Sequence, residues 1–188
     1  MLILLSKVVR YSPDGSLWAS GGFDGKIFLY DGKDSEPKGE LSGHSGGIYG
    51  LAWDGSSKKL LSASGDKSCK MWDIGTGACL ATFKLGDNVE DQQVGCLWSG
   101  PHMLSVSLSG FINFLDPEKP EKPKRVVKGH NKPVTKLIAS GDGKTIYTGG
   151  SDGVITSWDG GNPSLGGTVL ASATPALHTQ AMALLKGS

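Results

Sequence analysis

The sequence has few cysteines and no excess of charge of either sign. Its three cysteines, Cys69, Cys79 and Cys96, include no C-x-x-C pair. An odd number without such pairs argues against a disulfide framework and a zinc site, so we expect reduced thiols packed as small apolar side chains, as in a cytoplasmic protein. Lysine and arginine number 19 against 18 aspartates and glutamates. Because nucleic acid is bound by a basic patch, this balance predicts no nucleic-acid partner.

Long apolar runs are also missing. The apolar start, residues 1–5, is shorter than the roughly 7–15 residues of a signal peptide's apolar segment, and no basic residue precedes it. No stretch approaches the roughly 20 apolar residues that cross a bilayer. We therefore predict a cytoplasmic protein without membrane contact.

The usual sequence signatures of enzymes are not found either. We identify no nucleophile elbow, no glycine-rich loop that cradles a phosphate and no cluster of metal ligands. The sequence accordingly predicts no catalytic residue, no cofactor and no metal.

What the chain does contain is an internal repeat of about 43 residues. An aromatic residue or leucine followed by aspartate recurs at intervals of 42, 43 and 43 residues, at Tyr30-Asp31, Trp72-Asp73, Leu115-Asp116 and Trp158-Asp159. A Gly-His pair occurs at Gly43-His44 and, two periods later, at Gly129-His130. Two landmarks that share one period indicate a repeat architecture.

Each period contains short runs of apolar residues separated by turn residues, a pattern typical of strands. In the second period the expected strands are residues 48–53, 59–64, 68–73 and 78–83, and in the fourth they are 134–139, 144–148, 154–158 and 167–171. No segment has helical periodicity, so the predicted fold is all-β. We assign the four repeats approximately to residues 1–41, 42–84, 85–127 and 128–171, followed by a divergent tail, 172–188.

Four strands per period, Gly-His near the start and Trp-Asp at the end resemble the WD40 family. In that family each repeat supplies a four-stranded blade of a β-propeller, and the blades stack around a central channel. The resemblance implies four four-stranded WD40 blades. Because propellers of the family have more blades than four, we expect a partial, open propeller that is part of a longer one.

The resemblance also implies a buried, hydrogen-bonded tetrad of His, Ser or Thr, Asp and Trp in each blade. Complete sets occur in repeat two (His44, Ser62, Asp66, Trp72) and in repeat four (His130, Thr148, Asp152, Trp158). Repeat one has a partial set (Ser20, Asp24, Tyr30). Repeat three departs furthest, with Asp87, Ser105, Ser109 and Leu115 at the matching places, and should be the loosest blade.

Ser, His and Asp are also the residue types of a catalytic triad. However, the set recurs at the repeat period, and an indole N–H at its end is useful only as a structural hydrogen-bond donor. We therefore expect a structural role, in which each hydrogen bond avoids a burial penalty of about 1–3 kcal/mol.

A narrower resemblance centres on repeat three. Residues 91–98 (DQQVGCLW), 104–116 (LSVSLSGFINFLD) and 128–132 (KGHNK) resemble the actin-interacting WD-repeat proteins, double propellers that work with cofilin to disassemble actin filaments. This resemblance implies a non-catalytic cytoskeletal scaffold whose partners are actin and cofilin. A generic WD40 interaction module in another complex is the alternative. Under either hypothesis, candidate partner-binding residues lie in the loops that lead into the blades: Ser45, Gly47, Asn131 and Lys132.

Overall fold

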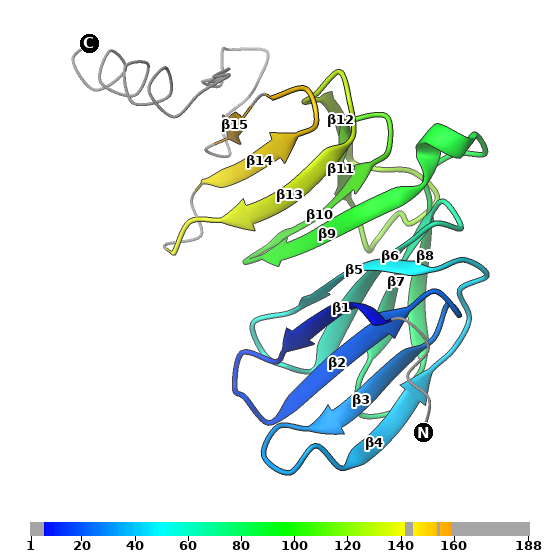
Figure 1. Cartoon of the computed structure of the whole chain (residues 1–188). Coiled ribbons are helices and arrows are strands. Elements are labelled where there is room, and N and C mark those ends of the chain that lie inside the picture. Colours follow the sequence, from blue (N-terminus) through cyan, green and yellow to red (C-terminus); the bar gives the residue numbers. More distant parts are fainter. Residues whose placement is uncertain (1–5, 142–144, 154, 159–188) are drawn as a thin grey trace.

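The computed structural model describes residues 6–141, 145–153 and 155–158, and this part of the chain forms four antiparallel sheets that follow one another in sequence order (Figure 1). The first sheet contains β1 (Ser6–Tyr11), β2 (Leu17–Gly22), β3 (Ile27–Asp31) and β4 (Pro37–Leu41). The second contains β5 (Ile48–Trp53), β6 (Lys59–Ser64), β7 (Ser68–Asp73) and β8 (Cys79–Lys84). The third contains β9 (Gln93–Ser99), β10 (His102–Ser107), β11 (Phe111–Leu115) and β12 (Arg125–Lys128), and the described part of the fourth contains β13 (Val134–Ala139), β14 (Ile146–Gly150) and β15 (Ile155–Trp158). We call these sheets blades one to four.

The hydrophobic core is divided among the three junctions between successive blades. One cluster joins blades one and two, a second joins blades two and three, and a third joins blades three and four. In β6 the neighbouring residues Leu60 and Leu61 belong to the first and second clusters, because successive side chains of a strand point to opposite faces. A middle blade is covered on both faces, which explains why β6 is buried along nearly its whole length.

The first strand of each blade lies against the first strand of the next, so β1, β5, β9 and β13 form the inner wall of the array. A register shift interrupts the pairing of β1, β5 and β13 with the second strand of their own blade, at equivalent positions two residues into each strand. Such bulges increase local twist. Blades one and four lie at opposite ends of the array (Figure 1).

The all-β fold with WD40-type blades is confirmed. In repeat two the four expected strands match β5 to β8 within one residue, whereas in repeat four the second strand begins at Ile146 instead of at residue 144. The predicted strand 167–171 and the tail 172–188 lie outside the described residues. One short 3-10 turn, η1 (Val89–Asp91), is the only helical element of the described part, which therefore contains no helix long and apolar enough to span a membrane.

Candidate functional site

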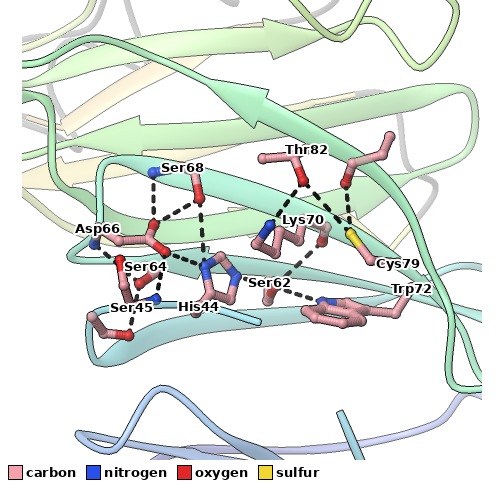
Figure 2. A network of polar contacts seen from close by, with 12 residues as sticks. His44, Ser45, Ser62, Ser64, Asp66, Ser68, Lys70, Trp72, Cys79 and Thr82 are labelled. Carbon is pink, nitrogen blue, oxygen red and sulfur yellow. Dashed lines mark hydrogen bonds and ion pairs between the residues drawn. The ribbon is translucent and has the colours of Figure 1, made fainter. Parts of the chain in front are cut away.

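Blade two contains a chain of four hydrogen-bonded side chains, here called the blade-two tetrad. Trp72 Nε1 donates to Ser62 Oγ at 2.8 Å, and Ser62 Oγ lies 2.7 Å from His44 Nε2. His44 Nδ1 lies 2.7 Å from Asp66 Oδ2. Because a carboxylate only accepts, Nδ1 carries a proton, and in the neutral ring Nε2 accepts from the Ser62 hydroxyl. Figure 2 shows this chain running from Asp66 to the indole of Trp72.

The Asp66 carboxylate holds two loops together. It accepts from the Ser45 N–H at 3.1 Å, in the loop before β5, and from Ser68 N–H at 3.0 Å and Oγ at 2.7 Å, at the start of β7. Burial raises the pKa of the Asp66 carboxyl, but hydrogen bonds from His44 and Ser68 outweigh burial and hold the pKa well below its usual value. Asp66 is therefore ionised in the folded blade at neutral pH.

Blade four repeats this arrangement. His130 Nε2 lies 2.7 Å from Thr148 Oγ1, and His130 Nδ1 lies 3.1 Å from Asp152 Oδ1. Asp152 Oδ2 accepts from the Asn131 N–H at 2.9 Å, as Asp66 does from Ser45. The predicted fourth member, Trp158, ends β15, and its side chain lies outside the described residues.

In blade one no hydrogen bond between described residues joins the predicted partial set. Asp24 is exposed and accepts from the Lys26 N–H at 3.1 Å. The Tyr30 hydroxyl is buried without a hydrogen-bond partner among the described residues, and its ring stacks on Trp18 with centroids 4.0 Å apart. Ser20 is buried. The tyrosine therefore replaces the packing of a tryptophan but not its hydrogen bond.

Blade three has a buried polar network that the matching of repeat positions did not predict. Asn113 Nδ2 donates to Gln93 Oε1 at 3.3 Å and lies 3.4 Å from Ser105 Oγ, while Gln93 Nε2 donates to the Asp91 carbonyl at 2.6 Å. Gln93 and Ser105 are fully buried, and Asn113 nearly so. Two amide side chains thus occupy the interior of this blade, and the signal for them is a glutamine and an asparagine within otherwise apolar strands.

The other residues compared in blade three play different parts. Asp87 is exposed and 3.9 Å from Lys84, Ser109 Oγ lies 2.8 Å from Ser107 Oγ in the β10–β11 turn, and Leu115 joins the core between blades two and three. Only Ser105 therefore takes part in the buried network of this blade.

The candidate partner-binding loops also form the junctions between blades. Ser45, Asn131 and Lys132 are exposed, and Gly47 is half-buried beside Phe23. A Cβ on Gly25, in the β2–β3 turn, would lie 2.7 Å from the His44 carbonyl oxygen. A Cβ on Gly110, in the β10–β11 turn, would lie 2.6 Å from that of His130 and 2.7 Å from that of Lys132. Both glycines have positive φ, +76° and +87°, so each loop packs on a turn of the preceding blade that only glycine permits.

The sequence contains the letters of the nucleophile-elbow motif, although the surrounding structure is not that of an elbow. The letters G-x-S-x-G occur twice, at residues 43–47 and 149–153. The first stretch lies in the connection between β4 and β5, and the second runs from the end of β14 into the turn before β15, so neither leads from a strand into a helix as a nucleophile elbow does. The described residues also contain no group of three or more His, Cys, Asp or Glu side chains placed to hold a metal ion.

The three cysteines are free, but they do not share one environment. Cys69 is buried, Cys96 is half-buried and Cys79 is exposed on β8. The expectation that all three pack as small apolar side chains is therefore wrong for Cys79.

Comparison with protein families matches the WD40 description "WD domain, G-beta repeat" to residues 7–31, 35–73 and 121–159. The chain belongs to the WD40-repeat family. The last two segments begin before or at the final strand of one blade and end with the third strand of the next, so a WD40 sequence repeat straddles two blades. The first three strands of blade three, β9 to β11, lie outside the matched segments. This is the blade that has a network of two buried amides and Ser105 instead of the tetrad.

Several WD40 relatives are similar over most of this chain. It is 53% identical to actin-interacting protein 1 of Drosophila melanogaster over 158 residues, which are 83% of this chain and 26% of that protein. It is 54% identical to WD repeat-containing protein 1 of Xenopus tropicalis over 156 residues (80% and 26%), and 50% identical to that of Mus musculus over 142 residues (74% and 23%). The chain therefore spans about a quarter of the length of these relatives.

Proposed function

We propose that this chain is a non-catalytic WD40 scaffold that forms part of an actin-interacting protein, binds actin and cofilin, and promotes the disassembly of actin filaments. The observation that carries the proposal is the 53% identity to a protein named actin-interacting protein 1, extending over 83% of the chain. The proposed location is the cytoplasm, at the actin cytoskeleton.

The geometry of the blade-two tetrad supports a scaffold over a hydrolase. A catalytic serine has to reach a substrate, but the Ser62 side chain is fully buried between His44 and Trp72. Its oxygen already accepts the indole N–H, and its proton is directed at His44 Nε2. The groups of this apparent triad are thus committed to one another.

The test is cosedimentation of the 188-residue chain with actin filaments, with and without cofilin. We expect the chain to pellet with cofilin-decorated filaments and to shorten them in fluorescence microscopy. Lys132→Glu should weaken pelleting, because it reverses a charge in an exposed candidate loop, whereas Lys33→Glu, in the β3–β4 loop, is the matched control.

Absence of the chain from the pellet under both conditions would contradict the proposal. If affinity capture then returned another complex without actin or cofilin, the generic WD40 interaction module would be favoured instead.

A further inference from the structure

The strands of the inner wall contain basic residues but no acidic ones. Its four strands, β1, β5, β9 and β13, contain Lys7, Arg10 and Lys136 but no aspartate or glutamate. The whole chain has nearly equal numbers of basic and acidic residues, so this wall departs from the average composition. A concave surface lined by one sign of charge attracts ligands of the opposite sign.

A cavity of about 90 Å³ opens on this wall, with residues of all four inner strands around it. Arg10 of β1 and Lys136 of β13 line it, together with the half-buried ring of Tyr49. The other lining residues come from β5, β9, β10 and β13: Gly50, Leu51, Val94, Gly95, Cys96, Val106, Val134, Thr135 and Leu137. Leu51, Val106 and Val134 are buried, so the surface that the cavity exposes is more polar than apolar. Since one water needs roughly 10–15 Å³ of such space, the cavity has room for a small organic group.

Close approach of β5 and β9 forms one side of the cavity. A Cβ on Gly50 would lie 2.7 Å from the Cys96 nitrogen and 2.9 Å from the Gly95 Cα, so a larger residue at position 50 does not fit. Glycine at position 50 therefore allows the backbones of β5 and β9 to lie close together beside the cavity.

Arg10 is held in place but has no acidic partner in the described part of the chain. Trp53 Nε1 donates to the Arg10 carbonyl at 3.1 Å, which ties β1 to β5, and Arg10 Nη1 donates to the Val9 carbonyl at 2.8 Å. The other guanidinium N–H groups, and the ammonium of Lys136, form no ion pair with described residues.

Cys96 lines the same cavity as Arg10 and lies within the influence of its charge. Burial raises the pKa of Cys96 well above its usual value, Cys69 adds to the increase, and the charge of Arg10 opposes it. The guanidinium therefore acts on the wall of the cavity.

We propose that this cavity binds the carboxylate of a glutamate side chain from an acidic peptide segment that runs along the inner wall. Arg10 and Lys136 pair with the carboxylate, and the half-buried side chains of Val94 and Leu137 contact the two methylene groups that precede it. This site is independent of the actin hypothesis, because it is defined by the residues of the cavity alone.

A nucleic acid fits the same wall less well. Three cations give a weak electrostatic footprint for a phosphate backbone, since phosphate contacts dominate that kind of affinity. Among the described residues, Tyr49 is the only aromatic one that lines the cavity, whereas single strands are held by successive stacked bases.

The test is fluorescence anisotropy of a labelled hexaglutamate peptide titrated with the 188-residue chain at about 50 mM salt and again at about 300 mM. Hexalysine, glutarate and a thymidine oligonucleotide are the comparison ligands. The key variant is Arg10→Gln/Lys136→Gln, and Lys33→Gln/Lys122→Gln removes the same charge from exposed residues outside the cavity.

We expect hexaglutamate to bind, with weaker binding at the higher salt concentration. The cavity double variant should lower the affinity at least about tenfold, because it removes both charges that pair with the carboxylate, and the control double variant less than about twofold. Thermal melts of both variants establish that they are folded.

The proposal is overturned if folded Arg10→Gln/Lys136→Gln binds hexaglutamate as tightly as the original chain, or if the original chain does not bind it at the lower salt concentration. If glutarate binds as tightly as hexaglutamate, the assignment to a peptide is overturned. If the oligonucleotide binds more tightly than hexaglutamate, the choice of ligand class is overturned. None of these outcomes depends on actin or cofilin.

Discussion

Blades two and three place polar side chains in comparable interiors but satisfy them with different chemistry. Blade two uses an ionised aspartate, an imidazole, a hydroxyl and an indole, arranged in one chain. Blade three uses two neutral amides and a hydroxyl, anchored to the Asp91 carbonyl. Both solutions obey the same rule, that a polar group removed from water needs a hydrogen-bond partner. The comparison teaches that a blade can satisfy its buried polar groups with residues at other positions of the repeat, since only Ser105 matches a member of the blade-two tetrad.

The largest expected effect is the loss of the imidazole in blade two. His44→Ala leaves Asp66 and Ser62 without their shared partner, and we expect it to lower the free energy of unfolding by about 3 kcal/mol. Urea denaturation measures the change. A cost no greater than that of an exposed substitution such as Lys33→Ala would contradict a structural role for the tetrad.

The next effect concerns the glycine turns that receive the loops of blades two and four. Gly25→Ala and Gly110→Ala combine a positive φ with a clash against a carbonyl oxygen, so each should cost about 2–3 kcal/mol. Gly15→Ala is the matched control, since Gly15 has φ +69° but a Cβ added there would meet no neighbouring atom within 4 Å. Thermal melts should show a smaller decrease in melting temperature for Gly15→Ala than for the other two variants. Equal decreases for all three variants would contradict the close packing of the junctions.

A smaller effect is expected in blade three. Asn113→Leu removes the donor shared by Gln93 and Ser105 and should cost about 1–2 kcal/mol in urea denaturation. The double variant Gln93→Met/Asn113→Leu removes both amides, so its cost should be less than the sum of the single changes. Strict additivity would show that the two amides do not act together.

The smallest expected effect is a difference between blades two and three in how the stability contributed by their buried polar groups depends on pH. The folded-state pKa of Asp66 lies below its ordinary value of 3.8, so its contribution is complete above about pH 4 and is lost as the pH falls through the lower folded-state pKa. The stability difference between the original chain and Asp66→Asn should therefore shrink as the pH falls below 4. The cost of Asn113→Leu should remain constant, because its network has no ionisable group. Equal pH dependence in both blades would contradict this assignment.

The spacing of residues was sufficient to predict much of the fold. The recurrence of Gly-His and Trp-Asp located the strands of blade two, because residues at the same position of the repeat occupy equivalent places in successive blades. The position of His44 next to Ser62 and Asp66 also agrees with that spacing.

Features without a repeat could not be predicted in this way. Gln93 and Asn113 have no counterparts elsewhere in the chain, so only the folded blade brings them together. The inner-wall cavity combines residues of β1, β5, β9, β10 and β13, and this proximity arises from the stacking of blades. Whether blade three is the loosest blade stays a prediction, which native-state hydrogen exchange can address.

The most direct measurement is a double-mutant cycle between His44→Ala and Trp72→Phe, followed by urea unfolding. Ser62 connects the two side chains, so the account predicts a coupling energy of about 1–2 kcal/mol that disappears in a Ser62→Ala background. Additive effects, or a coupling unchanged by Ser62→Ala, would contradict a hydrogen-bonded tetrad that stabilises the blade.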